Sequence, residues 1–420
     1  MCELARAGTP RVLTEFQEDP RRWRTLAFVV TATVFSLTVW FSTNAISPAL
    51  QAERGYSGSD IAWLTIAVQL GFVLGTLTIA ATNLADIMNT RKLFAISAVL
   101  AGVANAALIF LPDAIAPAIG LRVLTGVFLG GVYPPGMKIL SGWFRSGRGI
   151  AIGAMIAALT LGSGSPHLLQ SIFVAQWELT LCISSALAAL AGGLIYFMVQ
   201  DGPLDVPAPK MDPHMLLHAI RDRPMRLVFF GYLGHMWELY AMWAHIPVFL
   251  GAVYGTKSLI GNPLDLASFI TFIVFLAGAV GSVAAGYGAE RFGRTATTSL
   301  AMIISGGSAL FIGFLPMDWQ VVILIVAIVW GASVVADSAQ FSTALSELCE
   351  EAYRGTSLTL QTGLGFLITI VPIWLVPVVA ASSGWGVAFA ILAVGPALGT
   401  VAMLRLRSMP EAAALALGRR

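Results

Sequence analysis

The run LAFVVTATVFSLTVWFSTNAISPAL, from Leu26 to Leu50, contains no charged side chain. About 20 consecutive apolar residues are enough for a helix to cross the hydrocarbon core of a bilayer. The basic group Arg21-Arg22-Trp23-Arg24 precedes the run, as in a signal peptide. The run is roughly twice as long as a signal-peptide core, however, and further apolar segments follow it. We therefore predict that residues 26–50 form a first transmembrane helix.

The composition of the whole chain also indicates a membrane protein. Of its 420 residues, 57% are hydrophobic and 11% are charged, and the mean hydropathy is +0.82. Soluble chains average about a quarter charged residues, so a soluble globule of this size is excluded. The net charge of +2, without a basic patch, argues against nucleic acid as a partner. Three scattered cysteines, Cys2, Cys182 and Cys349, fit neither a disulfide framework nor a zinc site, and we expect no cofactor.

Apolar segments of similar length recur along the chain, bounded by charged residues, glycine or proline. They predict twelve transmembrane helices, at residues 26–50, 61–82, 93–111, 115–140, 149–172, 177–199, 227–252, 264–286, 296–315, 319–341, 356–380 and 384–404. Only one gap is long, and it separates two sets of six helices. The predicted parts are an N-terminal segment 1–25, a bundle 26–199, a central loop 200–226, a bundle 227–404 and a tail 405–420.

The positions of lysine and arginine predict the orientation, because positive residues near helix ends stay on the cytoplasmic side. Of the 24 lysines and arginines, 21 fall on one side of the predicted topology, and the exceptions are Arg54, Arg122 and Lys257. We therefore expect both termini and the central loop to be cytoplasmic. The expected location is a bacterial inner (plasma) membrane.

The two halves show signs of internal repetition. Leu84-Ala85-Asp86, after the second predicted helix, lies 204 residues before Gly288-Ala289-Glu290, after the eighth. Trp40 and Trp243 lie 203 residues apart. Transporters often arise from duplicated halves, so we predict an all-α polytopic protein of two six-helix bundles related by a pseudo-two-fold repeat.

Several short motifs resemble those of a known family. The segment Gly286-Tyr-Gly-Ala-Glu290-Arg291-Phe-Gly293-Arg294 is similar to the G-x-x-A-D/E-R-x-G-R loop of major facilitator superfamily transporters. Its first copy, residues 82–92, keeps the acid Asp86 but lacks both glycines and the arginines at the matched positions. The run Arg122-x-x-x-Gly126-x-x-x-Gly130 is similar to the family's fourth-helix pattern, and Gly153, Gly162 and Pro166 partly match its fifth-helix motif.

The resemblance implies two bundles around a central cavity that opens alternately to either side, lined by helices 1, 4, 7 and 10. It also implies gating roles for the loop residues Asp86, Glu290, Arg291 and Arg294. The acids would lie near helix N-termini of the opposite half, and the arginines would form charge-assisted pairs. The alternative is that these loops are only signals of a positive-inside topology.

Ionisable groups inside the hydrocarbon region are costly and usually face a cavity or a partner. The seventh predicted helix has His235, Glu238, Met242 and His245 on one face, at steps of three, four and three. A buried carboxyl group at Glu238 could take up or release a proton near neutral pH, and His235 or His245 could share it. Structural hydrogen bonding is the alternative. The neighbouring Tyr240, Met242 and Trp243 are candidates for substrate contacts.

Two other helices carry polar groups at membrane depth. Asp337 on the tenth helix is a second proton-coupling candidate, and its counterpart at the repeat offset is Tyr133. Pro134 and Pro135 should interrupt the fourth helix and expose backbone carbonyls. Arg122 is either an anion-binding group or a structural partner of an acid. The candidate substrate-binding residues are Trp40, Asn44, Arg122, Tyr133, Tyr240, Met242 and Trp243.

The leading hypothesis is a proton-coupled secondary active transporter of a small organic solute, acting as a symporter or antiporter by alternating access. One alternative is a soft-metal, copper-type transporter that uses the His/Met/Glu face of the seventh helix. Another is a membrane sensor that transports nothing. An enzyme is not expected, because no catalytic motif or soluble catalytic domain is present. We expect a monomer, whose substrate and direction of transport the sequence leaves open.

Overall fold

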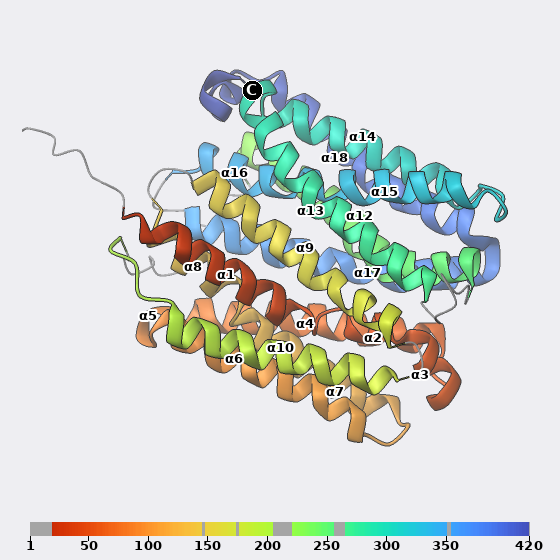
Figure 1. The fold of residues 1–420 in the computed structure, drawn as a ribbon. Helices are drawn as coiled ribbons and strands as arrows, with labels where there is room; N and C mark the ends of the chain where they lie inside the picture. Colours follow the sequence, from red (N-terminus) through yellow and green to blue (C-terminus); the bar gives the residue numbers. More distant parts are fainter. Residues whose placement is uncertain are drawn as a thin grey trace, which may run out of the picture.

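The computed structural model describes residues 19–144, 148–173, 176–204, 221–255, 265–350 and 354–419. Residues 1–18 of the predicted N-terminal segment and residues 205–220 of the predicted central loop lie outside this part of the chain. Within the described residues the regular structure is helical throughout. Figure 1 shows long helices lying side by side in two groups, with the first half of the chain below the second.

The first half contains α1 (Arg21–Leu37), α2 (Ser42–Ala45), α3 (Ser47–Arg54), α4 (Gly58–Thr82), α5 (Leu84–Ile87), α6 (Thr90–Ala106), α7 (Ile115–Gly130), α8 (Tyr133–Ser141), α9 (Arg148–Ile172) and α10 (Trp177–Met198). The second half contains α12 (Arg223–Tyr254), α13 (Leu266–Phe292), α14 (Arg294–Ile312), α15 (Gln320–Ala336), α16 (Ser338–Leu348), α17 (Arg354–Ala390) and α18 (Val394–Arg407). These elements follow the twelve predicted spans closely. The prediction of twelve helices in two bundles is confirmed.

Two of the predicted helices run together in the structure. The helical stretch α17 contains Gly384, whose φ of 80° and ψ of 171° are not helical, so the chain turns there. This turn separates the predicted spans 356–380 and 384–404. The second of them continues through Ala390 into α18.

Three predicted helices are broken inside their predicted spans. The first span divides into α1, α2 and α3, the fourth into α7 and α8, and the tenth into α15 and α16 at Asp337. The break in the fourth span was expected, because Pro134 and Pro135 occupy the first turn of α8 and have no N–H group to donate. The tenth span breaks at Asp337, which is the counterpart of Tyr133 in the internal repeat, and the sequence at this break contains no proline.

The segment 286–294 differs from the prediction of a loop. Helix α13 continues through this motif to Phe292, six residues beyond the predicted end at residue 286. The turn is made by Gly293 alone, whose φ of 97° lies in the left-handed region that glycine tolerates. The apolar run ends at the membrane surface, but charged residues such as Glu290 and Arg291 are compatible with a helix. The helix therefore continues beyond the end that hydropathy predicts.

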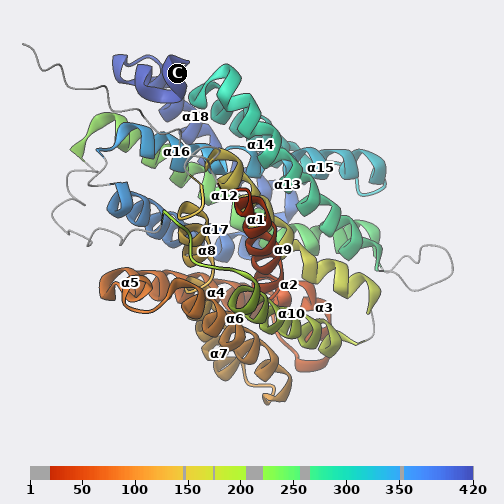
Figure 2. The ribbon, with the colours of Figure 1, turned by 60° about the vertical axis from the view of Figure 1, so that its left-hand side comes forward.

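The two halves pack against each other along two helix pairs, α9 with α13 and α4 with α17. Figure 2, turned from Figure 1, also shows α9 beside α13. Small residues allow the close approach in the first pair. A Cβ atom at Gly164 of α9 would lie 2.4 Å from Cβ of Phe275. The contact between halves is therefore sterically tight.

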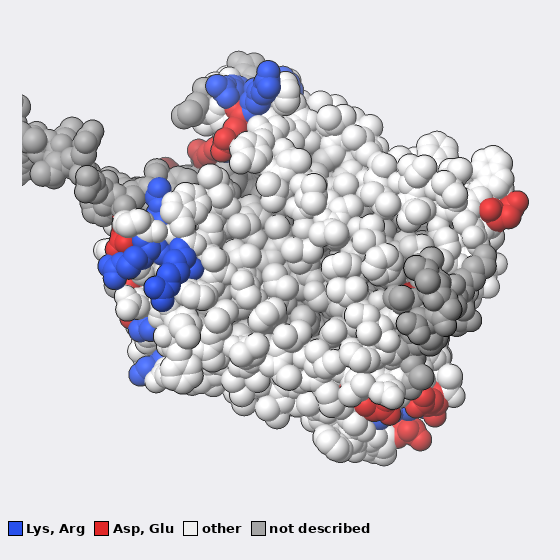
Figure 3. Space-filling model, in the orientation of Figure 1, with Lys and Arg blue, Asp and Glu red and all other residues white. Residues whose placement is uncertain are grey.

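Charged side chains gather at the two ends of the molecule and leave the wide middle uncharged (Figure 3). We call the end that carries most lysines and arginines the basic end. Helix α1 begins there and the described C-terminus lies there (Figure 1). The apolar belt between the ends is the surface expected of an integral multi-pass membrane protein.

The Arg122-x-x-x-Gly126-x-x-x-Gly130 pattern has a packing role that can be tested. A Cβ atom at Gly126 would lie 2.1 Å from the backbone oxygen of Val68 in α4, whereas one at Gly120, on the same helix α7, would meet nothing within 4 Å. Gly126→Ala should therefore destabilise the protein by about 1–3 kcal/mol. Gly120→Ala should be neutral or stabilising, since alanine favours helix. Thermal unfolding in detergent measures both. Equal midpoints for the two variants would contradict this packing.

Candidate functional site

Aromatic side chains from both halves meet at the centre of the molecule. This central aromatic cluster consists of Trp40, Phe41, Phe72, Tyr240, Trp243, Phe275 and Phe366. Ring centroids lie 6.0 Å apart for Trp40 and Tyr240, 5.9 Å for Phe41 and Trp243 and 4.7 Å for Phe72 and Phe366. All seven side chains are buried. The predicted substrate residues Trp40, Tyr240 and Trp243 are therefore brought together.

Asn44 joins the halves beside this cluster. Its side-chain Nδ2 donates to the backbone oxygen of Ala244 in α12 at 3.4 Å. Its Oδ1 accepts a hydrogen bond of 3.0 Å from Thr65 in α4. A second link between the halves lies farther from the basic end, where the backbone N–H of Asp265 donates to the backbone oxygen of Ser171 at 3.2 Å. The halves also touch in the basic half, where α16 packs on α9. Toward the end opposite the basic end, both halves line a cavity of about 270 Å³, with Asn44 and Ser47 from the first half and Ala244 and His245 from the second.

Several buried polar groups near the cluster have no hydrogen-bond partner among the described residues. They are Thr43 Oγ1, the indole N–H groups of Trp40 and Trp243, both amide atoms of Gln69 and Gln361, and both ring nitrogens of His167. The His167 ring lies 5.8 Å from that of Phe275, which belongs to the cluster. Buried polar groups are nearly always hydrogen-bonded in proteins, so these groups are exceptions within the described residues.

The break in the first helix is held by a buried arginine. Arg122 of α7 is fully buried and donates to the backbone oxygen of Val39 at 2.9 Å and to that of Trp40. It also donates to Asn105 Oδ1 at 3.2 Å. The partners of Arg122 in the described residues are neutral oxygens, and an acid, one of the two predicted alternatives, is not among them. Arg122 thereby satisfies carbonyls that the break removes from helical bonding, and it fixes the backbone that carries Trp40.

Glu238 lies inside the second half, between three helices. Its side chain is 1% exposed. It accepts hydrogen bonds of 2.8 Å from Ser305 in α14 and from the indole N–H of Trp330 in α15. The carboxyl group therefore faces the interior of its own bundle, and each of its oxygens has a partner.

A second polar pair lies close to Glu238. One member, His235, is on the same helix α12, and the other, Asp337, lies between α15 and α16. His235 Nδ1 is 2.8 Å from Asp337 Oδ1, and the two side chains are 1% and 2% exposed. The other ring nitrogen, Nε2, lies 3.1 Å from Ser338 Oγ. Asp337 and Ser338 stand at the break between α15 and α16. The pair therefore lies at a helix break.

The remaining residues of the seventh-helix face have separate environments. His245 lies 2.9 Å from the backbone oxygen of Ile373 in α17, and Met242 is fully buried. Within the described residues there is no group of three or more His, Cys, Asp or Glu side chains that could hold a metal ion. Tyr133 begins α8 at the break in the fourth helix and is half-buried.

The predicted gating residues lie at the basic end. Arg294 forms an ion pair of 2.8 Å with Glu347 of α16 and donates to Gln340 at 2.9 Å. Arg291 lies over the ring of Phe292, 5.6 Å from its centroid, and the backbone oxygen of Glu290 accepts from Arg419. These contacts lie within the second half. The expected position near the opposite half concerned the acids Asp86 and Glu290, and it stays a prediction. The side chain of Asp86, in α5, lies outside the described residues.

One carboxylate outside the membrane also belongs to the basic end. Asp201 accepts hydrogen bonds of 2.8 and 2.9 Å from Arg91. These bonds hold the pKa of the Asp201 carboxyl below its ordinary value. A lowered pKa means that the pair is fully formed at neutral pH and is lost only in strong acid. Asp201 therefore cannot supply pH dependence between pH 5 and 8.

Sequence analysis missed several polar members of the centre. Its substrate-binding and proton-coupling candidates lie on the first, fourth, seventh and tenth predicted helices, so Gln69, Gln361 and His167, on other helices, were passed over. Glutamine within a long apolar run is the signal that would have found the first two. Phe72, Phe275 and Phe366 carry no such signal, because phenylalanine is common on lipid-facing surfaces.

Residues 29–371 match the family described as the Major Facilitator Superfamily. The chain is 27% identical over 182 residues to the puromycin resistance protein pur8 of Streptomyces alboniger, across 41% of this chain and 35% of pur8. It is 24% identical over 245 residues to the MFS transporter asaE of Aspergillus flavus, across 57% of this chain and 53% of asaE. The matched regions thus span about a third to a half of these relatives.

Solved structures with the same fold cover nearly the whole chain. A mutant of the nucleoside transporter NupG superposes with a TM-score of 0.69 at 15% identity, across 91% of this chain and 99% of NupG. A bacterial homologue of the human lysosomal transporter Spinster, in an inward-facing and unoccupied conformation, gives 0.68 at 14% identity, across 94% of this chain and 100% of the homologue. At these identities the likeness concerns the fold.

The role of Arg122 can be tested by removing or keeping its charge. Arg122→Met leaves the carbonyl of Trp40 without a donor and leaves that of Val39 with Ser42 Oγ alone, so it should cost about 1–3 kcal/mol. Arg122→Lys keeps the charge but cannot reach both carbonyls and Asn105, so it should recover only part of the loss. Thermal unfolding in detergent measures both variants. If Arg122→Met unfolds at the same temperature as the wild type, Arg122 does not stabilise the break in the first helix.

The unpartnered amide of Gln69 should lower the stability of the solute-free protein. Gln69→Met keeps the length of the side chain and removes two buried unsatisfied groups, so it should raise stability by up to about 1–3 kcal/mol. Gln340→Met is the matched control, because Gln340 is also buried but accepts a hydrogen bond from Arg294. It should lower the unfolding midpoint. If both variants lose stability equally, the Gln69 amide has a partner after all.

Proposed function

Because the chain belongs to the major facilitator superfamily, a family of secondary transporters, we propose that it carries a small organic solute and couples that movement to protons. The solute would bind at the central aromatic cluster and reach it alternately from either side of the bilayer. Glu238, assisted by His235 and Asp337, would exchange the proton. The observation that carries this proposal is the hydrogen-bonding of Glu238, which suits both of its protonation states.

The partners of Glu238 explain why either state is tolerated. When ionised, the carboxylate accepts from Ser305 and Trp330, each at 2.8 Å. When protonated, it can donate to Ser305 Oγ, whose own hydrogen then turns to the backbone oxygen of Met302, 3.3 Å away. A serine hydroxyl both donates and accepts. No buried group loses its partner in either state, so the proton exchange carries a small penalty.

The pair of His235 and Asp337 would link protonation to movement. An imidazolium held against a carboxylate ties α12 to the start of α16, and loss of the proton weakens this tie. Helices broken at membrane depth are common at transporter binding sites, since half-helices can move separately. We propose that the proton on this pair sets the position of α16 relative to α12.

The central aromatic cluster and its unpartnered groups favour a planar polar solute. Aromatic rings offer stacking surfaces, while the amides of Gln69 and Gln361 offer donors and acceptors together. NupG is a nucleoside transporter by name, and pur8 confers resistance to puromycin by name. Nucleoside-like compounds are therefore the first class to test. The metal-transport alternative has less support, because the seventh-helix histidines bond to separate helices.

We further propose that the basic end faces the cytoplasm of a bacterial cell. Arg294 would leave Glu347 and, with Asp86, Glu290 and Arg291, engage the opposite half when that end closes. Two bundles bury their own interface, which supports a monomer.

The coupling role of Glu238 can be tested in proteoliposomes. We expect pools containing nucleosides, amino acids, sugars or organic cations to include one that drives proton movement through the wild type. Glu238→Gln should abolish this movement and concentrative uptake, because the amide cannot exchange a proton. It should keep exchange of labelled for unlabelled solute, which needs no net proton transfer.

Glu178→Gln serves as the matched control, since Glu178 is an exposed acid at the start of α10. It should behave as the wild type in all assays. Proton-coupled uptake that survives in Glu238→Gln would contradict the assigned role. Absence of flux with every pool in the wild type would favour the sensor alternative over transport.

A further inference from the structure

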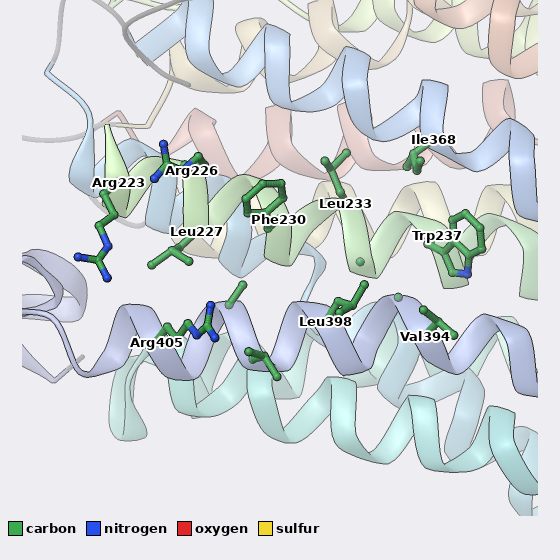
Figure 4. A pocket seen from close by; sticks show the side chains of 14 residues that line it. Arg223, Arg226, Leu227, Phe230, Leu233, Trp237, Ile368, Val394, Leu398 and Arg405 are labelled. Carbon is green, nitrogen blue, oxygen red and sulfur yellow. The ribbon is translucent and has the colours of Figure 1, made fainter. Parts of the chain in front are cut away.

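A long groove runs along the outer surface of the second half, between α12 and α18, away from the central cluster. Its volume is about 660 Å³. Its walls are apolar, with Phe230 and Trp237 from α12 and Val394 and Leu398 from α18 (Figure 4). Phe230, Val394 and Leu398 are each more than half exposed, which places the groove at the surface that contacts lipid.

The groove exists because the two helices touch through glycine. A Cβ atom at Gly234 would lie 2.3 Å from the backbone oxygen of Gly395, so no side chain can fill the space there. Trp237 donates its indole N–H to the backbone oxygen of Ile391 at 3.2 Å. Its polar edge is thereby satisfied, and only the apolar ring faces the groove. The walls and floor suit a hydrocarbon chain.

Three arginines surround one mouth of the groove, at the basic end. Arg223 and Arg226 lie in the first turn of α12, and Arg405 lies in the last turn of α18 (Figure 4). All three side chains are exposed. No acidic residue lines the groove, and none of the three forms an ion pair with a described carboxylate. The mouth therefore favours an anionic group.

The length of the groove matches one leaflet of a bilayer. From Leu227 to Trp237 is ten residues of helix, or about 15 Å at 1.5 Å per residue. The hydrocarbon core of a bilayer is about 30 Å thick, so one leaflet is about 15 Å. With the arginines at the level of the headgroups, Trp237 lies near the bilayer midplane.

We propose that this groove binds one anionic phospholipid from the leaflet at the basic end. An acyl chain lies along Phe230, Leu398 and Trp237, and the phosphate lies between Arg226, Arg405 and Arg223. Arginine suits this role because its guanidinium forms paired hydrogen bonds with phosphate. A free phosphate would leave the apolar walls uncovered, and a zwitterionic lipid would gain less from three cations. The site is separate from the transport pathway, since Glu238 and His235 face the bundle interior from the same helix.

Native mass spectrometry of the detergent-purified protein tests this proposal, with dioleoylphosphatidylglycerol as the probe. We expect one tightly retained lipid per chain. Arg226→Gln combined with Arg405→Gln should weaken its binding roughly thirty-fold, because each arginine contributes about five-fold near an anionic lipid. Leu398→Trp should also weaken binding, by filling the groove without changing the charge.

Three comparisons keep the proposal falsifiable. Arg24→Gln combined with Lys92→Gln removes two exposed charges at the same end but outside the groove, and should leave binding unchanged. Dioleoylphosphatidylcholine should bind at least ten-fold more weakly, and glycerol 3-phosphate, which lacks chains, should not be retained. Equal loss in the control pair, equal binding of phosphatidylcholine, or retention of glycerol 3-phosphate would each overturn the assignment. The thermal unfolding midpoint of each variant should equal that of the wild type, which would show that the variants are folded.

Discussion

The contact of Arg122 with the carbonyls of Val39 and Trp40 is the interaction on which the centre of the molecule depends. In a bilayer, backbone groups released by a helix break have no water to bond to, so the protein must supply the partner. Arg122 does so from α7, and the first helix can then turn. The turn directs Trp40 and Phe41 toward the second half, where they meet Tyr240 and Trp243.

The two halves have different electrostatic roles despite their shared architecture. The first half buries Arg122, whose side chain keeps its proton in proteins. The second half buries Glu238 and the pair of His235 and Asp337. The proposed coupling therefore belongs to the second half. The two halves meet through the packing of α9 on α13 and of α4 on α17.

Much of the fold could be predicted because hydropathy records the length of each membrane crossing. The break in the fourth helix was also predictable, since Pro134 and Pro135 lack the N–H groups a continuous helix needs. The breaks near Trp40 and at Asp337 contain no proline. They depend on contacts with other helices, such as Arg122 with Val39, and a pattern within one helix does not contain them.

In the candidate site, too, some features could be predicted from the sequence and others depend on contacts between helices. Charge at membrane depth identified Glu238, Asp337 and His235, but not their partners, because Ser305 and Trp330 come from helices whose facing sides only packing decides. Gln69 was overlooked because it lies on a helix that holds none of these candidates. From the sequence, Arg223 and Arg405 indicated only the topology of the chain. Their position beside one groove became visible only in the structure.

The central claim is that Glu238 exchanges a proton during transport, and infrared difference spectroscopy of the protein in lipid tests it most directly. Once a transported solute is known, its addition should change the carbonyl stretch of a protonated carboxylic acid. We predict that this difference band is present in the wild type and absent in Glu238→Gln. A band that persists unchanged in Glu238→Gln would contradict the claim and direct attention to Asp337.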